Sequence, residues 1–149
     1  MKNKIFRKIL YIMSALSVCI TVIGGICIPW ITEWYYLYFA NGEAPKFMSV
    51  FLFITIIPFL LLLIEVMKLS KSLLNDTYLN KDTLKRLKRI SIYSLIEFFI
   101  YLFNIIFMYR NLVFIVVTIA TLMVFMITSV IRELIVKGIE LKEENDLTI

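Results

Sequence analysis

Two acidic side chains interrupt the long apolar segments of this sequence, and they are its clearest candidates for chemistry. Glu97 lies about seven residues inside an apolar run, where an unpaired charge costs ~2.5–3.5 kcal/mol on insertion scales. It must therefore be protonated, paired with another helix, or placed in a water-filled cavity. Helical spacing puts Tyr93, Tyr101 and Asn104 on the same face, so these four residues form a candidate intramembrane polar site. The stripe is typical of interhelical hydrogen bonding or of a proton- or ligand-responsive centre.

The second acid, Glu65, lies near the end of another apolar run. Lys68 follows one helical turn later, so we expect Glu65 to pair with Lys68 or to reach the lipid headgroups. Pro58, midway along the same run, should kink its helix and free the backbone carbonyl of Ile54.

Residue types elsewhere argue against catalysis. The chain has no histidine, the commonest general base and metal ligand. Cys19 and Cys27 are eight positions apart on one predicted helix, which is too far for a disulfide. We expect both to act as ordinary buried apolar side chains. We find no catalytic triad, metal-ligand cluster or phosphate-binding loop in the sequence. We expect a non-enzymatic protein without catalytic residues, bound metal or cofactor.

The elements that carry these residues are long enough to cross a bilayer. The chain is 61% apolar with a mean hydropathy of +0.90, against about 45–50% apolar for soluble domains. A span of about 20 residues matches the ~30 Å hydrocarbon layer. The sequence therefore predicts an all-α fold, a polytopic four-transmembrane-helix bundle in a single domain over residues 1–149. The predicted spans are 9–31, 47–67, 90–108 and 112–131.

Charge sets the predicted orientation. Fourteen of the sixteen Lys and Arg residues fall in the N-terminus, the loop 68–89 and the tail 132–149. The loop between the first two spans carries only Lys46, and the last loop only Arg110. The positive-inside rule places both termini and the 68–89 loop in the cytoplasm. An aromatic belt marks the outer end of the first span; it comprises Trp30, Trp34, Tyr35, Tyr36 and Tyr38.

The predicted cytoplasmic side carries two charged segments. Asn80 or Asp82 should cap a helix that runs into the third span, and the fourth span should continue past Arg132 and end near Gly138. The candidate partner surface combines a basic stretch with an acidic tail: Lys85, Arg86, Lys88, Arg89, Glu143, Glu144, Asn145 and Asp146. The basic stretch should contact anionic lipid headgroups, and direct nucleic-acid binding is not expected because the charges flank membrane spans.

A stripe of small residues, Ser17, Thr21 and Gly25, recurs every four positions in the first span. Such a stripe lets another helix approach closely. The partner helix belongs either to this chain or to a second copy in a homo-oligomer.

Two cytoplasmic segments carry a family resemblance. The C-terminus, Leu-Lys-Glu-Glu-Asn-Asp-Leu-Thr-Ile at 141–149, and the stretch Asn-Lys-Asp-Thr-Leu-Lys-Arg-Leu-Lys-Arg-Ile at 80–90 resemble the bacterial membrane family "domain of unknown function 2975". The resemblance also covers chain length and four spans. It implies a bacterial plasma-membrane location and a context beside a small helix-turn-helix regulator of the Cro/repressor type. It supplies no catalytic residue.

Three functions follow as hypotheses. The first is a regulatory or sensory protein whose basic loop and acidic tail bind a small cytoplasmic regulator. The second is self-protection against a membrane-active peptide through Trp34 and Tyr35. The third is a small carrier centred on Glu97, which would need to dimerise because four spans are few for a carrier.

Overall fold

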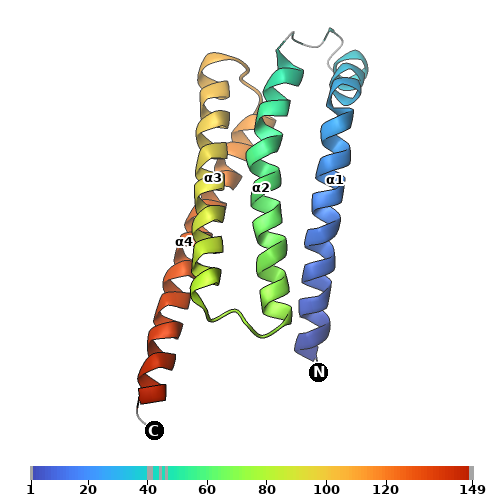
Figure 1. Cartoon of the computed structure of the whole chain (residues 1–149). Coiled ribbons are helices and arrows are strands. Elements are labelled where there is room, and N and C mark those ends of the chain that lie inside the picture. Colours follow the sequence, from blue (N-terminus) through green and yellow to red (C-terminus); the bar gives the residue numbers. More distant parts are fainter. Residues whose placement is uncertain (1, 40–41, 44, 46, 148–149) are drawn as a thin grey trace.

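In the part of the chain that it describes, the computed structural model contains four helices, which confirms the all-α prediction (Figure 1). It describes all residues except 1, 40, 41, 44, 46, 148 and 149, so Lys46 and the last two residues of the C-terminal motif lie outside the described residues. The helices are α1 (Lys2–Tyr38), α2 (Met48–Leu74), α3 (Lys81–Phe107) and α4 (Leu112–Leu147). Each is long and apolar enough to cross a bilayer, and the chain is a multi-pass membrane protein.

Every helix extends beyond the apolar run that predicts it. Hydropathy marks the part that prefers lipid, whereas the helical hydrogen bonds continue into polar sequence because they are local. The segment predicted as the loop 68–89 is thus mostly helical, and only 75–80 connects α2 to α3. Of the two predicted caps, Asn80 is the N-cap of α3: its side-chain oxygen accepts a hydrogen bond from the Thr83 amide at 2.8 Å, and Asp82 lies in the first turn.

The predicted end of the fourth helix near Gly138 is wrong. α4 continues through Gly138 to Leu147. A Cβ atom at position 138 would lie 3.2 Å from a methyl group of Leu79. This glycine therefore permits close approach of the 75–80 connection to α4, rather than stopping the helix.

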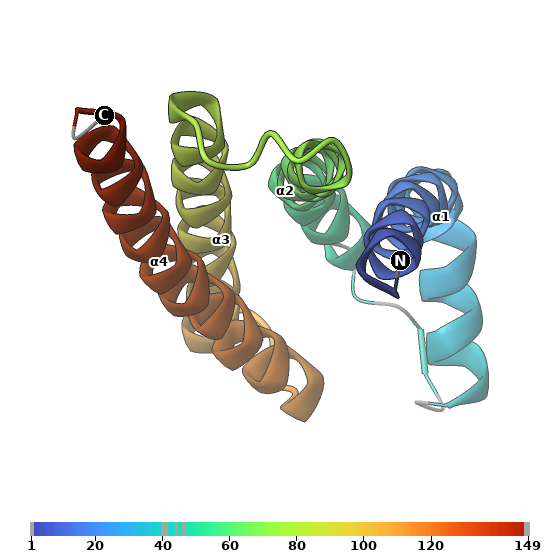
Figure 2. The same ribbon diagram turned by 90° about the horizontal axis from the view of Figure 1, so that it is seen from below.

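The four helices form an open row in chain order. Each packs against its sequence neighbour, α1 on α2, α2 on α3 and α3 on α4. Figure 2 shows this row from one end, with α1 and α4 at its two edges. Both termini lie at the same end of the row, called here the terminal end (Figure 1). The connection 75–80 also lies at the terminal end, and the other two connections lie at the opposite end.

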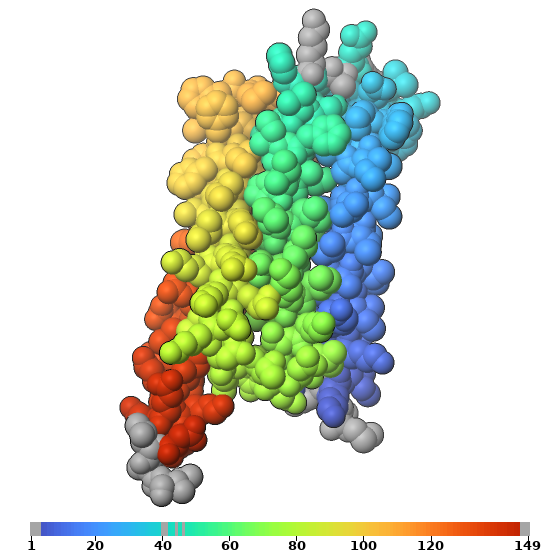
Figure 3. All heavy atoms as spheres, in the orientation of Figure 1, coloured from blue at the N-terminus to red at the C-terminus, as the bar shows by residue number. Residues whose placement is uncertain are grey.

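Most of the large apolar side chains face outward, as expected when lipid is the solvent. Figure 3 shows one face of the row, across which α1, α2 and α3 lie side by side. The contacts between helices use small and polar groups as well as apolar ones. Gly25 of α1 is buried against α2, where a Cβ would lie 2.8 Å from a methyl group of Ile56, whereas Gly24 has nothing within 4 Å. The stripe of small residues therefore packs within the chain at Gly25. Buried apolar side chains are few among the described residues: Ile28, Met48, Phe51, Leu62, Leu87 and Ile90.

Candidate functional site

The face of α3 that meets the other helices is polar along most of its length. Ser94, Glu97 and Asn104 are at most 1% exposed, while Tyr93 and Tyr101 are half-buried. The predicted stripe therefore turns inward, as polar groups in a membrane should. Helical spacing explains this burial, because positions 94, 97, 101 and 104 recur every three or four residues.

The Glu97 carboxylate lies deep between α2 and α3. Neither of its oxygens makes a hydrogen bond with any described residue. The backbone of Phe59, which follows the buried Pro58 in α2, lies near the carboxylate. Both polar atoms of the Asn104 side chain likewise lack a partner within the described part of the chain. Such groups are costly and rare in folded proteins.

Tyr101 lies between these two residues along α3 and packs against two other helices. Its side chain lines the same cavity as Thr55 of α2. Its ring packs 5.7 Å from Phe51 of α2 and 6.1 Å from Phe114 of α4, measured between ring centroids. These aromatic contacts hold the Tyr101 ring in place, one helical turn along α3 from Glu97.

A cavity of about 310 Å³ opens beside Tyr101 between α1, α2 and α3. It brings hydroxyl groups from separate helices to one space, namely those of Thr21, Thr55 and Tyr101. Its other lining residues are mostly apolar; they are Gly24, Ile28, Leu52, Ile56 and Phe59. The three hydroxyl groups could therefore bind water or a small polar ligand in this cavity, near Glu97.

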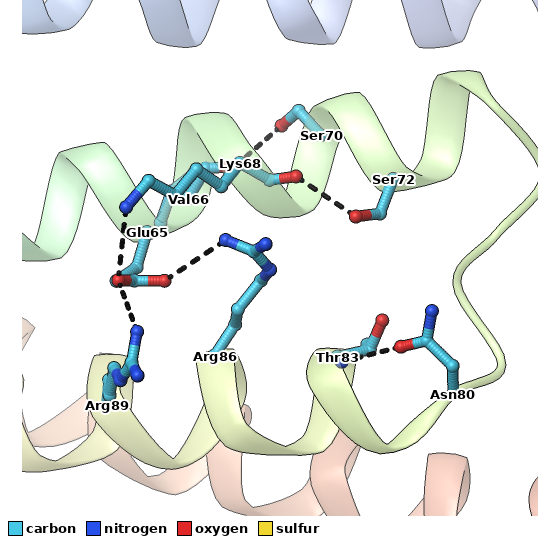
Figure 4. Close-up of polar contacts among 9 residues, drawn as sticks. All are labelled: Glu65, Val66, Lys68, Ser70, Ser72, Asn80, Thr83, Arg86 and Arg89. Atoms are coloured by element: carbon cyan, nitrogen blue, oxygen red, sulfur yellow. Dashed lines mark hydrogen bonds and ion pairs between the residues drawn. The ribbon is translucent and has the colours of Figure 1, made fainter.

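The second acid, Glu65, has a different environment (Figure 4). It is 5% exposed, and three cationic side chains surround its carboxylate. The distances from carboxylate oxygen to nitrogen are 3.1 Å to Arg89, 3.6 Å to Arg86 and 3.6 Å to Lys68. We call these four residues the Glu65 cluster. The predicted pairing of Glu65 with Lys68 is confirmed.

Sequence reasoning missed the two arginines of this cluster. They come from α3, whereas Glu65 and Lys68 come from α2. Their distance in sequence from the connection 75–80 could have predicted this contact. When two consecutive helices pack antiparallel, residues at similar distances before and after the connection lie side by side. Arg86 and Arg89 thus face α2.

The remaining residues of the candidate partner surface lie apart from this cluster. Lys85 and Lys88 are exposed, and Lys85 lies 4.0 Å from Asp82 in an i,i+3 ion pair. The tail residues Glu143, Glu144, Asn145 and Asp146, three of them acidic, are exposed near the end of α4. Lys142 of the same segment lines a groove with the connection 75–80, so the tail lies next to the α2–α3 turn.

At the opposite end, the aromatic residues of α1 pack on one another. Trp34 contacts Tyr38 and Phe39 at centroid distances of 5.7 and 5.4 Å. A groove of about 1010 Å³ runs along Trp30, Trp34 and Tyr38. Within the described residues, no group of three or more acidic or cysteine side chains could hold a metal ion.

The comparisons with known proteins place the chain in a family. Residues 28–149 match the family model described as "Protein of unknown function (DUF2975)". The chain belongs to the DUF2975 family. The DUF2975 match contains α2, α3 and α4 whole, so it includes both buried acids and the acidic tail. No curated protein and no solved structure matches the chain.

Proposed function

We propose that this protein is a non-enzymatic regulatory protein of the bacterial plasma membrane that binds a small cytoplasmic regulator through the end of α4. The single observation that supports this proposal is the continuity of α4. One helix of 36 residues contains both an apolar span and a charged, exposed segment at the terminal end. A change in the packing of the span would move the exposed segment with it, because the two are parts of one helix.

The exposed segment of α4 has the composition of a docking helix. Leu134 and Leu141 are each 63% exposed and lie seven residues apart, hence on the same face. An amphipathic helix with apolar residues at this spacing fits a hydrophobic groove in a partner. The exposed end of α4 is apolar along one face and acidic at its tip, and this composition supports a role in binding a partner.

The acidic tip is not explained by helix stability. Negative charge near a helix C-terminus opposes the macrodipole, at a cost of about 0.3–1 kcal/mol for each residue. Glu140, Glu143 and Asp146 are nevertheless exposed there, and the last turn has no basic residue. A basic partner surface would compensate this charge, and the family resemblance suggests a small helix-turn-helix regulator as that partner. The positive-inside rule supports a cytoplasmic location for this end.

Charge reversal tests the proposal. The variant Glu140→Lys/Glu143→Lys should lose its co-purifying regulator when the full chain is isolated from native membranes, because like charges would then face each other across the contact. The matched control, Glu33→Lys/Glu43→Lys, makes the same charge change at the opposite end and should retain the partner. Equal retention by both variants would contradict the proposal.

A second candidate is a carrier centred on Glu97. The buried, unbonded carboxylate supports it, because intramembrane acids often mark ion or proton pathways. Four helices in an open row would require a second copy of the chain to enclose a path. Proton flux across vesicles containing the purified protein is the measurement that separates this candidate from a regulator.

A further inference from the structure

The Glu65 cluster contains more positive charge than its carboxylate can neutralise. Lys68, Arg86 and Arg89 supply three cations, and Glu65 supplies one anion. A helix–helix ion pair needs only one cation. Two positive charges are therefore left without a compensating group inside the cluster.

The arginines also retain unused hydrogen-bond donors. Each contacts Glu65 through one terminal nitrogen. The Arg86 Nε atom is buried and has no hydrogen-bond partner among the described residues. The side chains of Lys68 and Arg89 are 46% and 53% exposed, so a ligand can reach the cluster from outside. Guanidinium groups with free donors favour phosphate, which they bind with two parallel hydrogen bonds.

The position of the cluster identifies the kind of phosphate. Glu65 and Lys68 lie at the end of the apolar run 47–67, and Arg89 directly precedes the run 90–108. The cluster therefore lies at the level where hydrocarbon gives way to lipid headgroups, whichever way the protein is inserted.

Apolar side chains continue from the cluster along both helices. Leu61 is one turn from Glu65, and Ile92 and Ile96 are one and two turns from Arg89. All three are more than 40% exposed. These side chains form an apolar surface next to the cationic site. Acyl chains of a lipid could pack on this surface, whereas a free phosphate ion would not contact it.

We propose that the Glu65 cluster binds the phosphodiester of one anionic phospholipid, with its acyl chains along α2 and α3. Arg86, Arg89 and Lys68 bind the phosphate, and Glu65 is a positioning residue that holds the two guanidinium groups side by side. The site is independent of the proposed regulator, because it lies between α2 and α3 rather than on the end of α4.

Native mass spectrometry of the full chain in detergent, titrated with phosphatidylglycerol or phosphatidylcholine, tests the site. We expect one retained phosphatidylglycerol and no comparable retention of phosphatidylcholine. Arg86→Gln/Arg89→Gln should weaken phosphatidylglycerol binding by about 25-fold, since each charge near a membrane surface contributes about a factor of five in affinity. Lys85→Gln/Lys88→Gln removes the same charge from exposed positions of the same helix and should leave that lipid bound. Equal weakening by both variants would show diffuse attraction and overturn the proposal.

Three further measurements test whether the loss of lipid reflects misfolding, whether Glu65 positions the arginines, and whether the ligand is free phosphate. Glu65→Gln/Arg86→Gln/Arg89→Gln leaves no buried unpaired acid and should fold, yet still lose the lipid. Glu65→Gln alone raises the positive charge but should weaken binding, and Glu65→Asp should restore it; tighter binding by Glu65→Gln would refute the positioning role. Inorganic phosphate should not raise the melting temperature as phosphatidylglycerol does, and an equal rise would assign the site to free phosphate instead.

Discussion

Glu65 and Glu97 are both buried acids, but their surroundings give them opposite effects on stability. Glu65 has three cationic neighbours within 3.6 Å, whereas neither oxygen of Glu97 has a hydrogen-bond partner among the described residues. A buried charge is tolerated when it is paired and costs free energy when it is not. Glu97 thus lowers stability at its position, which is typical of a residue retained for function.

Paired substitutions at the residue scale test this contrast. Glu97→Met should raise the free energy of unfolding by roughly 1–3 kcal/mol, because it removes a desolvated polar group at nearly constant shape. Glu65→Met should lower it by a similar amount, because it leaves Arg86 and Arg89 without their partner, although their partial exposure limits the loss. Thermal unfolding in detergent measures both. Destabilisation by both variants would show that Glu97 has partners that the described contacts do not include.

At the scale of the element, helix packing depends on where each glycine lies rather than on how many there are. Gly25 faces α2 with Ile56 against it, while the neighbouring Gly24 has open space. Gly138 allows the 75–80 connection to reach α4. In a membrane, close backbone approach is a main source of helix association because lipid removes the hydrophobic drive.

The two adjacent glycines provide a matched comparison. Gly25→Leu should separate α1 from α2 and lower the melting temperature, because even the first carbon of the new side chain would lie 2.8 Å from Ile56. Gly24→Leu makes the same chemical change and gains the same helix propensity of up to about 1 kcal/mol, so it should be neutral or stabilising. Thermal unfolding of the two variants gives the comparison. A fall in melting temperature of equal size in both would contradict the packing described for Gly25.

At the scale of the whole molecule, the row of helices concentrates charge at one end. The termini, the 75–80 connection and the charged end of α4 all lie at the terminal end (Figure 1). The residues of the Glu65 cluster lie within about three helical turns of the 75–80 connection. At this end Arg7 links α1 to the end of α2. It forms an ion pair with Asp76 and donates a hydrogen bond of 3.1 Å to the backbone carbonyl of Leu73. Because positively charged segments tend to remain on the cytoplasmic side during membrane insertion, we expect this whole end to lie on one side of the membrane.

Labelling of intact cells tests that orientation. In a chain whose two cysteines are replaced by alanine, a thiol introduced by Asp82→Cys should not react with a membrane-impermeant reagent, because the terminal end is expected in the cytoplasm. A thiol introduced by Gly42→Cys at the opposite end should react. Both positions should react after the cells are permeabilised. Reaction at position 82 in intact cells would reverse the topology and remove the support for a cytoplasmic partner.

The sequence alone predicted the elements because their signals are local. Four apolar runs predicted four spans, Asn80 or Asp82 predicted the start of α3 to within two residues, and the spacing of Glu97 and Asn104 predicted which face of α3 turns inward. Hydropathy and helical periodicity are enough for these features, since lipid requires each spanning segment to satisfy its own backbone. The helix end predicted at Gly138 failed because a glycine that ends a helix and one that permits a close contact look the same in sequence.

The tertiary structure decided which residues meet across helices. Arg86 and Arg89 read as a solvated basic stretch until α2 and α3 are paired, and only then do they converge on Glu65. The order of the row, the cavity beside Tyr101 and the isolation of the Glu97 carboxylate depend in the same way on contacts between segments distant in the chain. Sequence determined what each helix is because that follows from neighbouring residues and the solvent; packing alone determined what each buried charge has beside it.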